Sequence, residues 1–373
     1  MQKRRMLIVG GGIGGMATAI ALSQAGHEVD LIELDAQWRV YGAGITITGP
    51  TLRAFKSLGV LDAIREQAYT GDGIQVCSID GTRLAVLPTP VRPEDGIPGC
   101  GGIMRPVLHK ILSERVLAAG VNVRLGVTVR KLTQVADQVD VTMTDGRCCK
   151  YDLVIGADGL FSRIRSLIFP DSPAPAYTGQ SAWRVQLPRP PEIDRRHFFL
   201  GGPYKVGLTP VSSEQMYMFL LENSVEKRRL PDNELHEELQ RLTRSYGGII
   251  GAIGASLTAE STIVHRPLEA FLLPGPWYRG RVLLIGDAAH PTTPQLASGA
   301  GLAAEDGLVL ADELSKSDQI DFALTRYMSR RYERCLLVVK NSLEIGRREQ
   351  AGRPIEEQTM LVEQSLKMLA NPI

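Results

Sequence analysis

The sequence predicts an α/β protein built on a doubly wound parallel sheet, with an inserted antiparallel sheet and a C-terminal helical segment. Residues 6–9 form a short, continuously apolar run that leads into a glycine-rich turn and a helical pattern, which is typical of a buried parallel strand. Between residues 172 and 274, runs with a period of two alternate with turns that contain proline and glycine, which predicts antiparallel strands. From about residue 318 the pattern is helical and rich in charge.

The turn after the first strand has the spacing of a phosphate-binding motif. Residues 10–15 read GGGIGG and satisfy G-x-G-x-x-G, with Ile13 and Gly14 between the motif glycines Gly10, Gly12 and Gly15. These glycines allow a tight turn, a close approach of backbone to a pyrophosphate, and close helix–strand packing, respectively. The following helix offers unpaired N–H groups and a positive dipole end to phosphates. A second strand then delivers Glu33, which suits a ribose 2′-hydroxyl, so we predict a Rossmann-like dinucleotide-binding unit.

Two later strands also end in a glycine and an acid. The strand predicted at residues 152–156 leads to Asp158 and Gly159, and the strand predicted at residues 281–285 leads to Gly286 and Asp287. Ligands of doubly wound sheets bind across the carboxyl ends of the strands. We therefore expect these strand ends to converge on one long ligand, which the glycine motif alone does not assign to NAD or FAD.

The order and spacing of these motifs resemble the single-component, FAD-dependent aromatic hydroxylases of the p-hydroxybenzoate hydroxylase type. The similarity spans about residues 8–312. It implies non-covalently bound FAD, with Asp287 on the ribityl chain, Arg105 near the ribityl–phosphate region, and Asp158 in a turn that serves FAD and NAD(P)H. The segment that ends at Val129 would lie beside the adenine. Further cofactor contacts are implied at Ala43, Gly44, Gly299, Ala300 and Gly301.

The same resemblance implies the reaction. The enzyme would hydroxylate a small aromatic or heteroaromatic compound with NAD(P)H and O2, transferring oxygen from a flavin C4a-hydroperoxide. Pro294 would present its backbone carbonyl toward the substrate oxygen. No second dinucleotide motif is present, so we expect NAD(P)H to bind transiently to the same domain. The alternatives are an FAD-dependent reductase or desaturase of the same fold, and an FAD-containing binding protein without turnover.

The inserted sheet is expected to roof the reacting ring of the cofactor and to select the substrate. On the strand predicted at residues 215–221, Tyr217 shares a face with Phe219, and on a strand expected to be its neighbour, His197 shares a face with Phe199. Such a set gives stacking surfaces with a donor and an acceptor, although a core role for Tyr217 and a surface role for His197 are the alternatives. Further pocket candidates are Gln295, beside Pro294, and Arg184, which alternatively braces the two domains. No arginine is evidently placed for a substrate carboxylate, and His290 has no evident partner.

These patterns divide the chain into three parts. We assign residues 1–75, 100–171 and 275–317 to the FAD-binding domain, and residues 76–99 and 172–274 to the substrate-binding sheet domain. Residues 318–373 would form C-terminal helices whose mixed charges indicate solvated faces.

Composition excludes several other classes. The net charge of +1 gives no electrostatic case for nucleic acid or an anionic membrane surface. The five cysteines lack metal-ligand spacing, so no metal site is expected, and they fit ordinary thiols in a reducing cytoplasm. No apolar run has the length of a membrane span, and glycines interrupt the N-terminal apolar run too early for a signal peptide. A homodimer is compatible with these features.

Overall fold

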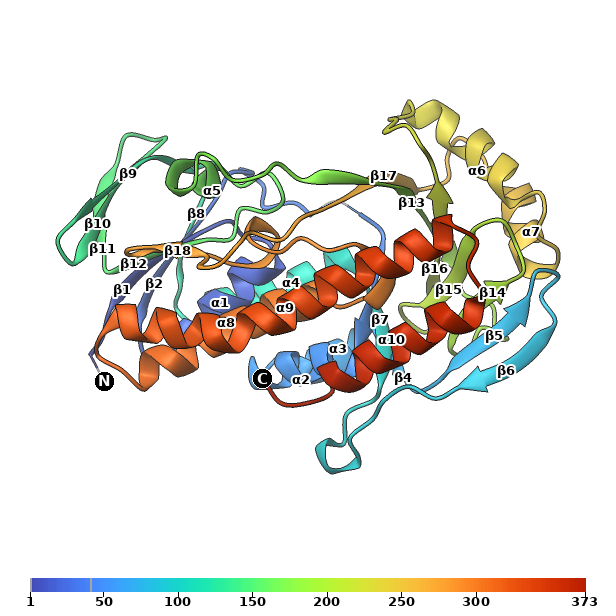
Figure 1. Ribbon diagram of the computed structural model, residues 1–373, viewed down its shortest axis with the longest axis horizontal. Helices are drawn as coiled ribbons and strands as arrows, with labels where there is room; N and C mark the ends of the chain where they lie inside the picture. Colours follow the sequence, from blue (N-terminus) through green and yellow to red (C-terminus); the bar gives the residue numbers. More distant parts are fainter. Residues whose placement is uncertain (1, 41) are drawn as a thin grey trace.

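The computed structural model of the chain describes residues 2–40 and 42–373. At one end of the molecule lies a six-stranded sheet, here called the first sheet (Figure 1). Its strands, in spatial order, are β18 (Tyr278–Arg279), β19 (Val282–Leu284), β12 (Leu153–Gly156), β1 (Arg5–Val9), β2 (Glu28–Glu33) and β8 (Asn122–Leu125). All neighbouring pairs are parallel except β18–β19. The strands that end in a glycine and an acid are therefore adjacent, as the sequence predicts.

Helices built partly from small residues cover the first sheet. The helices α1 (Ile13–Gln24) and α8 (Gly299–Ser315) pack closely. Gly307 permits this contact, because a Cβ added there would lie only 2.6 Å from the Cα atom of Thr18. Other elements of this part are α2 (Gly49–Ser57), α3 (Leu61–Gln67), α4 (Arg105–Ala118) and α5 (Arg163–Ile168). Two small sheets flank them, one of β3 (Gly44–Thr48), β7 (Cys100–Met104) and β4 (Tyr69–Gly71), the other of β11 (Cys148–Tyr151), β10 (Gln138–Met143) and β9 (Val129–Val135).

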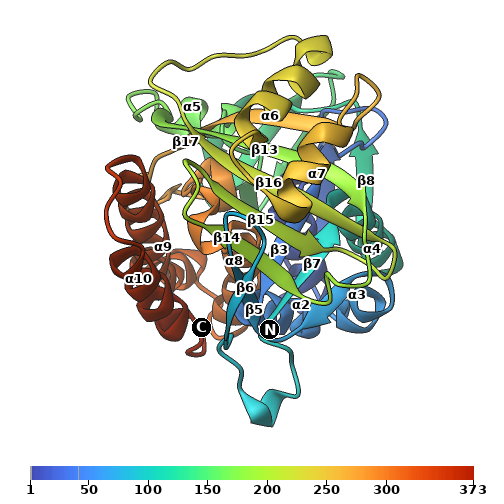
Figure 2. The ribbon, with the colours of Figure 1, turned by 90° about the vertical axis from the view of Figure 1, so that its right-hand side faces the viewer.

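The other end of the molecule holds a seven-stranded sheet, here called the roof sheet. Its strands, in spatial order, are β17 (Ile263–Ala270), β13 (Ala176–Pro188), β16 (Gln215–Asn223), β15 (Lys205–Pro210), β14 (Arg196–Leu200), β5 (Ile74–Ser78) and β6 (Arg83–Leu87). The helices α6 (Leu235–Thr243) and α7 (Gly248–Ser256) cover its outer face (Figure 2). Met216 and Met218 pack in the outer core beneath these helices, so Tyr217 and Phe219 face inward.

One predicted strand pairing is wrong. The sequence predicts that the strand of His197 is a neighbour of the strand of Tyr217, but β15 lies between β14 and β16. The run at residues 205–210 supplies this intervening strand because two turns, at residues 201–204 and 211–214, return the chain twice.

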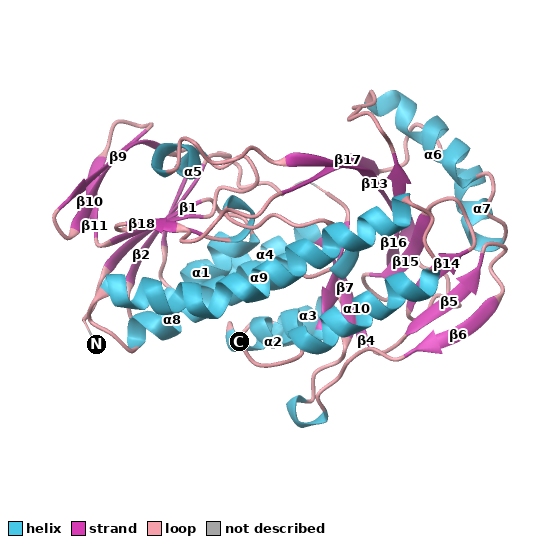
Figure 3. Cartoon of the chain, in the orientation of Figure 1, coloured by secondary structure: helices cyan, strands magenta, loops and turns pink. Residues whose placement is uncertain are grey.

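The last two helices are α9 (Ile320–Gln350), which runs the length of the molecule beside α8, and α10 (Ile355–Leu369), which turns back and packs against α9 (Figure 3). The expectation of solvated helix faces is wrong for part of α9. Arg331 on this helix is fully buried and forms ion pairs with Glu305 and Asp306 of α8. Among the described residues, no helix combines the length and the apolar character that crossing a membrane requires.

Candidate active site

A cavity of about 490 Å³ lies between the carboxyl ends of the first sheet and the inner face of the roof sheet. Its volume is in the range of small-molecule and cofactor sites. One wall comes from the glycine turn and the segments that follow β12 and β19, and the opposite wall from the inward-facing residues of β13, β14, β15 and β16. The cavity therefore joins the predicted nucleotide site to the predicted substrate roof.

The three motif glycines fit the roles that their spacing predicts. Gly10 has a φ of +112°, and a Cβ there would lie 2.3 Å from the carbonyl oxygen of Ala157. A Cβ at Gly15 would lie 1.9 Å from the carbonyl oxygen of Gly10, so the packing of α1 on β1 requires glycine. Gly12 has open space beside it and lines the cavity together with Ile13 and Gly14. The N-terminus of α1 thus faces the cavity with its backbone free for an anionic ligand.

Glu33 lies at the end of β2 beside the glycine turn. Its carboxylate accepts hydrogen bonds from the backbone N–H of Gly11, at 2.7 Å, and from that of Asp35, at 2.8 Å. The backbone N–H of Val127 donates to the Glu33 carbonyl at 3.0 Å, which brings the segment before Val129 to the same strand end. Val129 itself is fully buried in the pairing of β9 with β10 and does not line the cavity.

Asp287 and two arginines bring charge into the cavity wall. Asp287 lines the cavity in a short 3-10 turn, Gly286–Ala288, and among the described residues no group hydrogen-bonds its carboxylate. Desolvation by the surrounding protein raises the pKa of Asp287, and the charges of His290 and Arg105 act to lower it, although the side chain is exposed to the open cavity. Arg105 and Arg184 also line the cavity without an ion-pair partner in the described part of the chain. Burial lowers the pKa of Arg184, with Tyr217 opposing and Arg105 adding to the shift. Asp287 is exposed to the cavity and both arginines are partly exposed, so this part of the cavity offers an acceptor and two cations to a polar ligand.

The remaining predicted cofactor residues divide between the cavity wall and its support. Gly44, Gly299 and Ala300 line the cavity. Three others do not: Ala43 is buried, Gly301 packs against Thr51, and the Asp158 carboxylate accepts hydrogen bonds within its own turn. The donors to Asp158 are the Ser162 hydroxyl and the Ile164 N–H, while its neighbours Ala157 and Gly159 reach the cavity.

Tyr217 lies in the roof and faces the cavity, as predicted. Its hydroxyl is 2.8 Å from the Oγ1 atom of Thr46, and its ring centroid is 6.4 Å from that of Phe219. The ring packs on Gly44, where a Cβ would lie 2.2 Å from the Cδ1 atom of Tyr217. The Tyr217 ring is thus fixed by close packing, and its hydroxyl is one of the polar groups of the roof.

His197 does not line the cavity, which corrects the predicted placement. Its Nδ1 atom lies 2.8 Å from the carbonyl oxygen of Arg195, and its ring stacks at 6.5 Å on Phe199, which belongs to the outer core. Because side chains alternate along a strand, Arg196 and Phe198 face the cavity in its place. Both faces of this strand carry an aromatic and a basic residue, so composition did not indicate which face is inward.

Pro294 and Gln295 line the cavity in the 3-10 turn Pro294–Leu296. The Nε2 atom of Gln295 donates to the Oε1 atom of Gln180 at 2.9 Å and to the Oε2 atom of Glu349 at 3.2 Å. The Oε1 atom of Gln295 is buried without a hydrogen-bond partner among the described residues. The sequence does not indicate the contact of Glu349 with Gln295, because this acid is one of many in the charged C-terminal helices.

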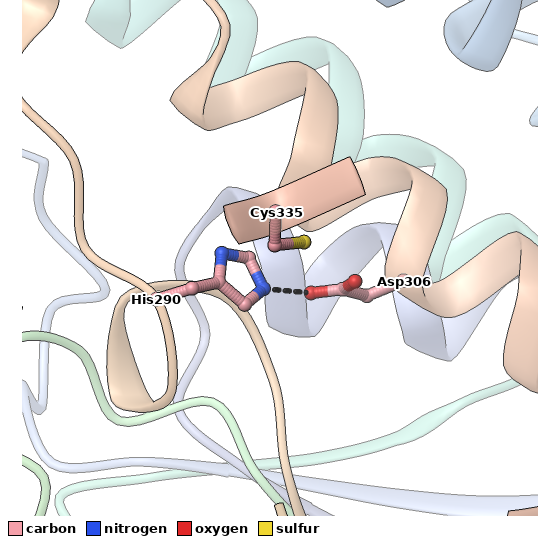
Figure 4. Close-up of side chains that lie close together, drawn as sticks. All are labelled: His290, Asp306 and Cys335. Atoms are coloured by element: carbon pink, nitrogen blue, oxygen red, sulfur yellow. Dashed lines mark hydrogen bonds and ion pairs between the residues drawn. The ribbon is translucent and has the colours of Figure 1, made fainter. Parts of the chain in front are cut away.

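A buried cluster supports the loop that carries Asp287 (Figure 4). The Oδ2 atom of Asp306 accepts hydrogen bonds from the Gly286 N–H at 2.9 Å and from Nε2 of His290 at 2.7 Å. Its Oδ1 atom accepts from Nε of Arg331 at 2.8 Å. Burial acts to lower the pKa of His290, but Cys335 and Asp306 outweigh it and raise that pKa well above its ordinary value. His290 therefore has the partner that the sequence did not reveal, in an ion pair that positions the Asp287 loop.

A dinucleotide-binding sheet that shares one cavity with an aromatic roof fits an oxidoreductase that holds a dinucleotide cofactor beside its substrate. The chain belongs to the FAD binding domain family, whose model matches residues 3–342. The chain is 32% identical over 356 residues to 2-heptyl-3-hydroxy-4(1H)-quinolone synthase of Pseudomonas aeruginosa, covering 94% of this chain and 90% of that protein. It is 29% identical over 347 residues to the FAD-dependent urate hydroxylase of Klebsiella oxytoca, covering 88% and 86%.

A solved structure shares the whole fold. Klebsiella pneumoniae HpxO, crystallised with FAD and uric acid, superimposes with a TM-score of 0.85 at 23% identity, covering 98% of this chain and 96% of that one. The fold class predicted from the sequence is confirmed. Together, the family and its relatives identify the protein as an FAD-dependent monooxygenase.

The described residues fit FAD. The open backbone at Gly12, the unpaired Asp287 carboxylate and the unpaired Arg105 provide, in one cavity, an anion site, an acceptor for hydroxyl groups and a cation. A ligand with a pyrophosphate and a polyhydroxylated chain would satisfy all three. When bound, FAD supplies the redox and oxygen-activating chemistry that protein side chains lack.

Proposed function

We propose that the protein hydroxylates a small aromatic or heteroaromatic compound, with FAD as cofactor and NAD(P)H and O2 as co-substrates. The observation that carries this proposal is the single cavity that joins the glycine turn and Asp287 to the inward-facing aromatic side chains of the roof sheet. Two relatives are named for a quinolone product and for urate, which favours a ring that contains nitrogen.

In this proposal the first sheet and the start of α8 hold the cofactor. Asp287 would accept hydrogen bonds from ribityl hydroxyls, Arg105 would lie near the ribityl–phosphate region, and Glu33 would bind the adenosine ribose. The N-terminus of α1 faces the pyrophosphate. The backbone near Val129 lies beside the adenine, and the N-terminus of α8 faces the flavin ring. The residues that contact FAD or support these contacts are Gly10, Gly12, Ile13, Gly14, Gly15, Ala43, Gly44, Asp158, Gly299, Ala300 and Gly301.

The roof sheet and the turn at Pro294 orient the substrate. Tyr217 directs its hydroxyl toward a ring substituent and forms a hydrogen bond with Thr46, whose Oγ1 atom is 2.8 Å away. The Pro294 carbonyl accepts a hydrogen bond from the substrate, and Gln295 offers its unpaired Oε1 atom. Arg184 favours negative charge that develops on the ring. The apolar walls exclude water, which keeps the reacting carbon in place.

A panel of phenols, pyridines and purines tests this function. The FAD-loaded protein is mixed with each compound, and NAD(P)H oxidation, O2 consumption and hydroxylated product are followed together. We expect at least one ring to accelerate NAD(P)H oxidation and to yield product in step with O2. Flavin that binds but never turns over with any ring would indicate a binding protein, and turnover without O2 would indicate a reductase or desaturase.

We further propose a cytoplasmic homodimer. All five cysteines are free thiols, which fits a reducing compartment. Sedimentation of the FAD-loaded protein checks the oligomeric state.

A further inference from the structure

The end of α9 lies against the turn that carries Pro294 and against the roof sheet. Glu349, in the last turn of this helix, accepts hydrogen bonds at its Oε2 atom from Nε2 of Gln180 and from Nε2 of Gln295, each at 3.2 Å. Its Oε1 atom lies 2.8 Å from Nζ of Lys205. Gln180 belongs to β13, Lys205 to β15 and Gln295 to the 3-10 turn, so one carboxylate joins the helix to three other elements.

A glycine lets the helix come this close to the two amides. A Cβ at Gly346, three residues before Glu349, would lie 2.9 Å from Oε1 of Gln180 and 3.2 Å from Nε2 of Gln295. Only 8% of the Glu349 side chain is exposed. The carboxylate therefore acts on both amides at short range and away from bulk water.

The side-chain amides of Gln180 and Gln295 form a chain with that of Asn223. Nε2 of Gln295 donates to Oε1 of Gln180 at 2.9 Å, and Nε2 of Gln180 donates to Oδ1 of Asn223 at 3.1 Å. Three amides in a row could turn over together and exchange donor and acceptor roles without losing these bonds. An ionised carboxylate only accepts, so Glu349 permits one orientation, in which both Nε2 atoms face it.

Gln295 keeps an acceptor that the protein does not use. Its two amide N–H groups are taken by Gln180 and Glu349, while its Oε1 atom is buried without a hydrogen-bond partner among the described residues. Gln295 is 8% exposed and lines the cavity beside Pro294. A buried acceptor without a donor is costly, and a ligand that brings an N–H or O–H group removes this cost.

We propose that Glu349 is a positioning residue for substrate recognition. It fixes the amide of Gln295 so that the Oε1 atom accepts a hydrogen bond from a ring N–H or a hydroxyl group of the substrate. This inference rests on the proposed function and narrows its substrate to a ring that carries such a donor. Glu349 does not line the cavity, so it acts through Gln295 and not by contact with the substrate.

Rings with a donor and their methylated analogues test this assignment. The probes are 4-quinolone and N-methyl-4-quinolone, 2-pyridone and N-methyl-2-pyridone, and phenol and anisole, titrated into the FAD-loaded protein by calorimetry. We expect at least one donor ring to bind, and its affinity should fall about five- to tenfold in Gln295→Ala and in Glu349→Ala, as expected for the loss of one hydrogen bond. The methylated analogue should change little in either variant, because it has no donor to lose.

Two further variants separate positioning from a general structural effect. In the double variant Gln295→Ala/Glu349→Ala, the donor ring should bind no more weakly than in Gln295→Ala alone, because Glu349 acts through the amide that is already missing. Glu344→Ala removes an acid from the same helix, whose exposed pairs with Arg347 and Arg348 lie away from the cavity lining, and should leave both rings unaffected. A general loss of stability would instead weaken the two rings of a pair alike.

The inference and the proposed function fail in different ways. A donor ring that loses no more affinity than its methylated analogue in Glu349→Ala would overturn the inference and leave the proposed function intact. Losses that add fully in the double variant would also overturn it, since Glu349 would then act independently of Gln295. FAD-loaded protein that binds none of these rings and oxidises NAD(P)H with none of them would contradict the proposed function, and the inference with it.

Discussion

At the residue scale, Asp287 gives the clearest test of cofactor binding. Its carboxylate faces the cavity and has no hydrogen-bond partner among the described residues. In Asp287→Ala, therefore, no other group of the protein should lose a hydrogen-bond partner. We expect soluble protein whose FAD affinity is about ten- to a hundredfold weaker, since a hydrogen bond to a charged group contributes roughly 1.5–3 kcal/mol. Quenching of FAD fluorescence on titration measures this directly. An unchanged dissociation constant would remove Asp287 from the site.

Tyr217 tests substrate positioning. Tyr217→Phe keeps the ring that packs on Gly44 and deletes only the hydroxyl that pairs with Thr46. If that hydroxyl orients the substrate, NAD(P)H oxidation should continue, but a larger share of the O2 should emerge as hydrogen peroxide. The matched control is Thr46→Val, which removes the partner and keeps the tyrosine hydroxyl. Equal losses of thermal stability in both variants, with coupling as in the wild type, would show that the hydroxyl is only structural.

At the element scale, α9 is joined to α8 by a buried ion-pair cluster. Arg331 pairs with Glu305 and Asp306, and each of these three side chains is at most 4% exposed. Arg331→Met leaves buried carboxylates short of a countercharge, so we expect a loss of about 3–5 kcal/mol in the free energy of unfolding, measured with urea. Arg347→Met on the same helix breaks an exposed pair with Glu344 and should cost about 1 kcal/mol or less. Similar losses in both variants would contradict a structural role for the cluster.

The same cluster predicts how stability depends on pH. Asp306 is buried, which alone would raise its pKa, but His290 and Arg331 lower it from 3.8 to about 2. A depressed carboxyl pKa stabilises the fold above the unfolded value, and that contribution, about 2 kcal/mol, is lost as the pH falls through about 2. The raised pKa of His290 acts in the opposite sense, so its contribution is full below pH 6.5 and is lost as the pH rises through the raised pKa. Urea unfolding from pH 5 to pH 2 should show a shallower decline in Asp306→Asn than in the wild type, and equal declines would refute this assignment.

At the scale of the whole molecule, local patterns predicted the first sheet and its ligand class well. The roles of Gly10, Gly12 and Gly15 depend on the local geometry of one turn between a strand and a helix. Their spacing in the sequence is therefore enough to predict the nucleotide-binding turn. The face of β14 that holds His197 was not predictable, because it depends on the position of β15 between distant strands. The contacts of Arg331 and Glu349 join α9 to residues far away in the sequence, and no local pattern indicates them.

The function proposed for this cavity is the insertion of oxygen into an aromatic ring. The most direct measurement is a reaction under ¹⁸O2 with NAD(P)H and a ring that accelerates its oxidation, followed by mass spectrometry of the product. We predict that one labelled oxygen atom enters the ring for each NAD(P)H oxidised in a coupled reaction. Product without label, or NAD(P)H oxidation in which all of the O2 emerges as hydrogen peroxide, would contradict the account.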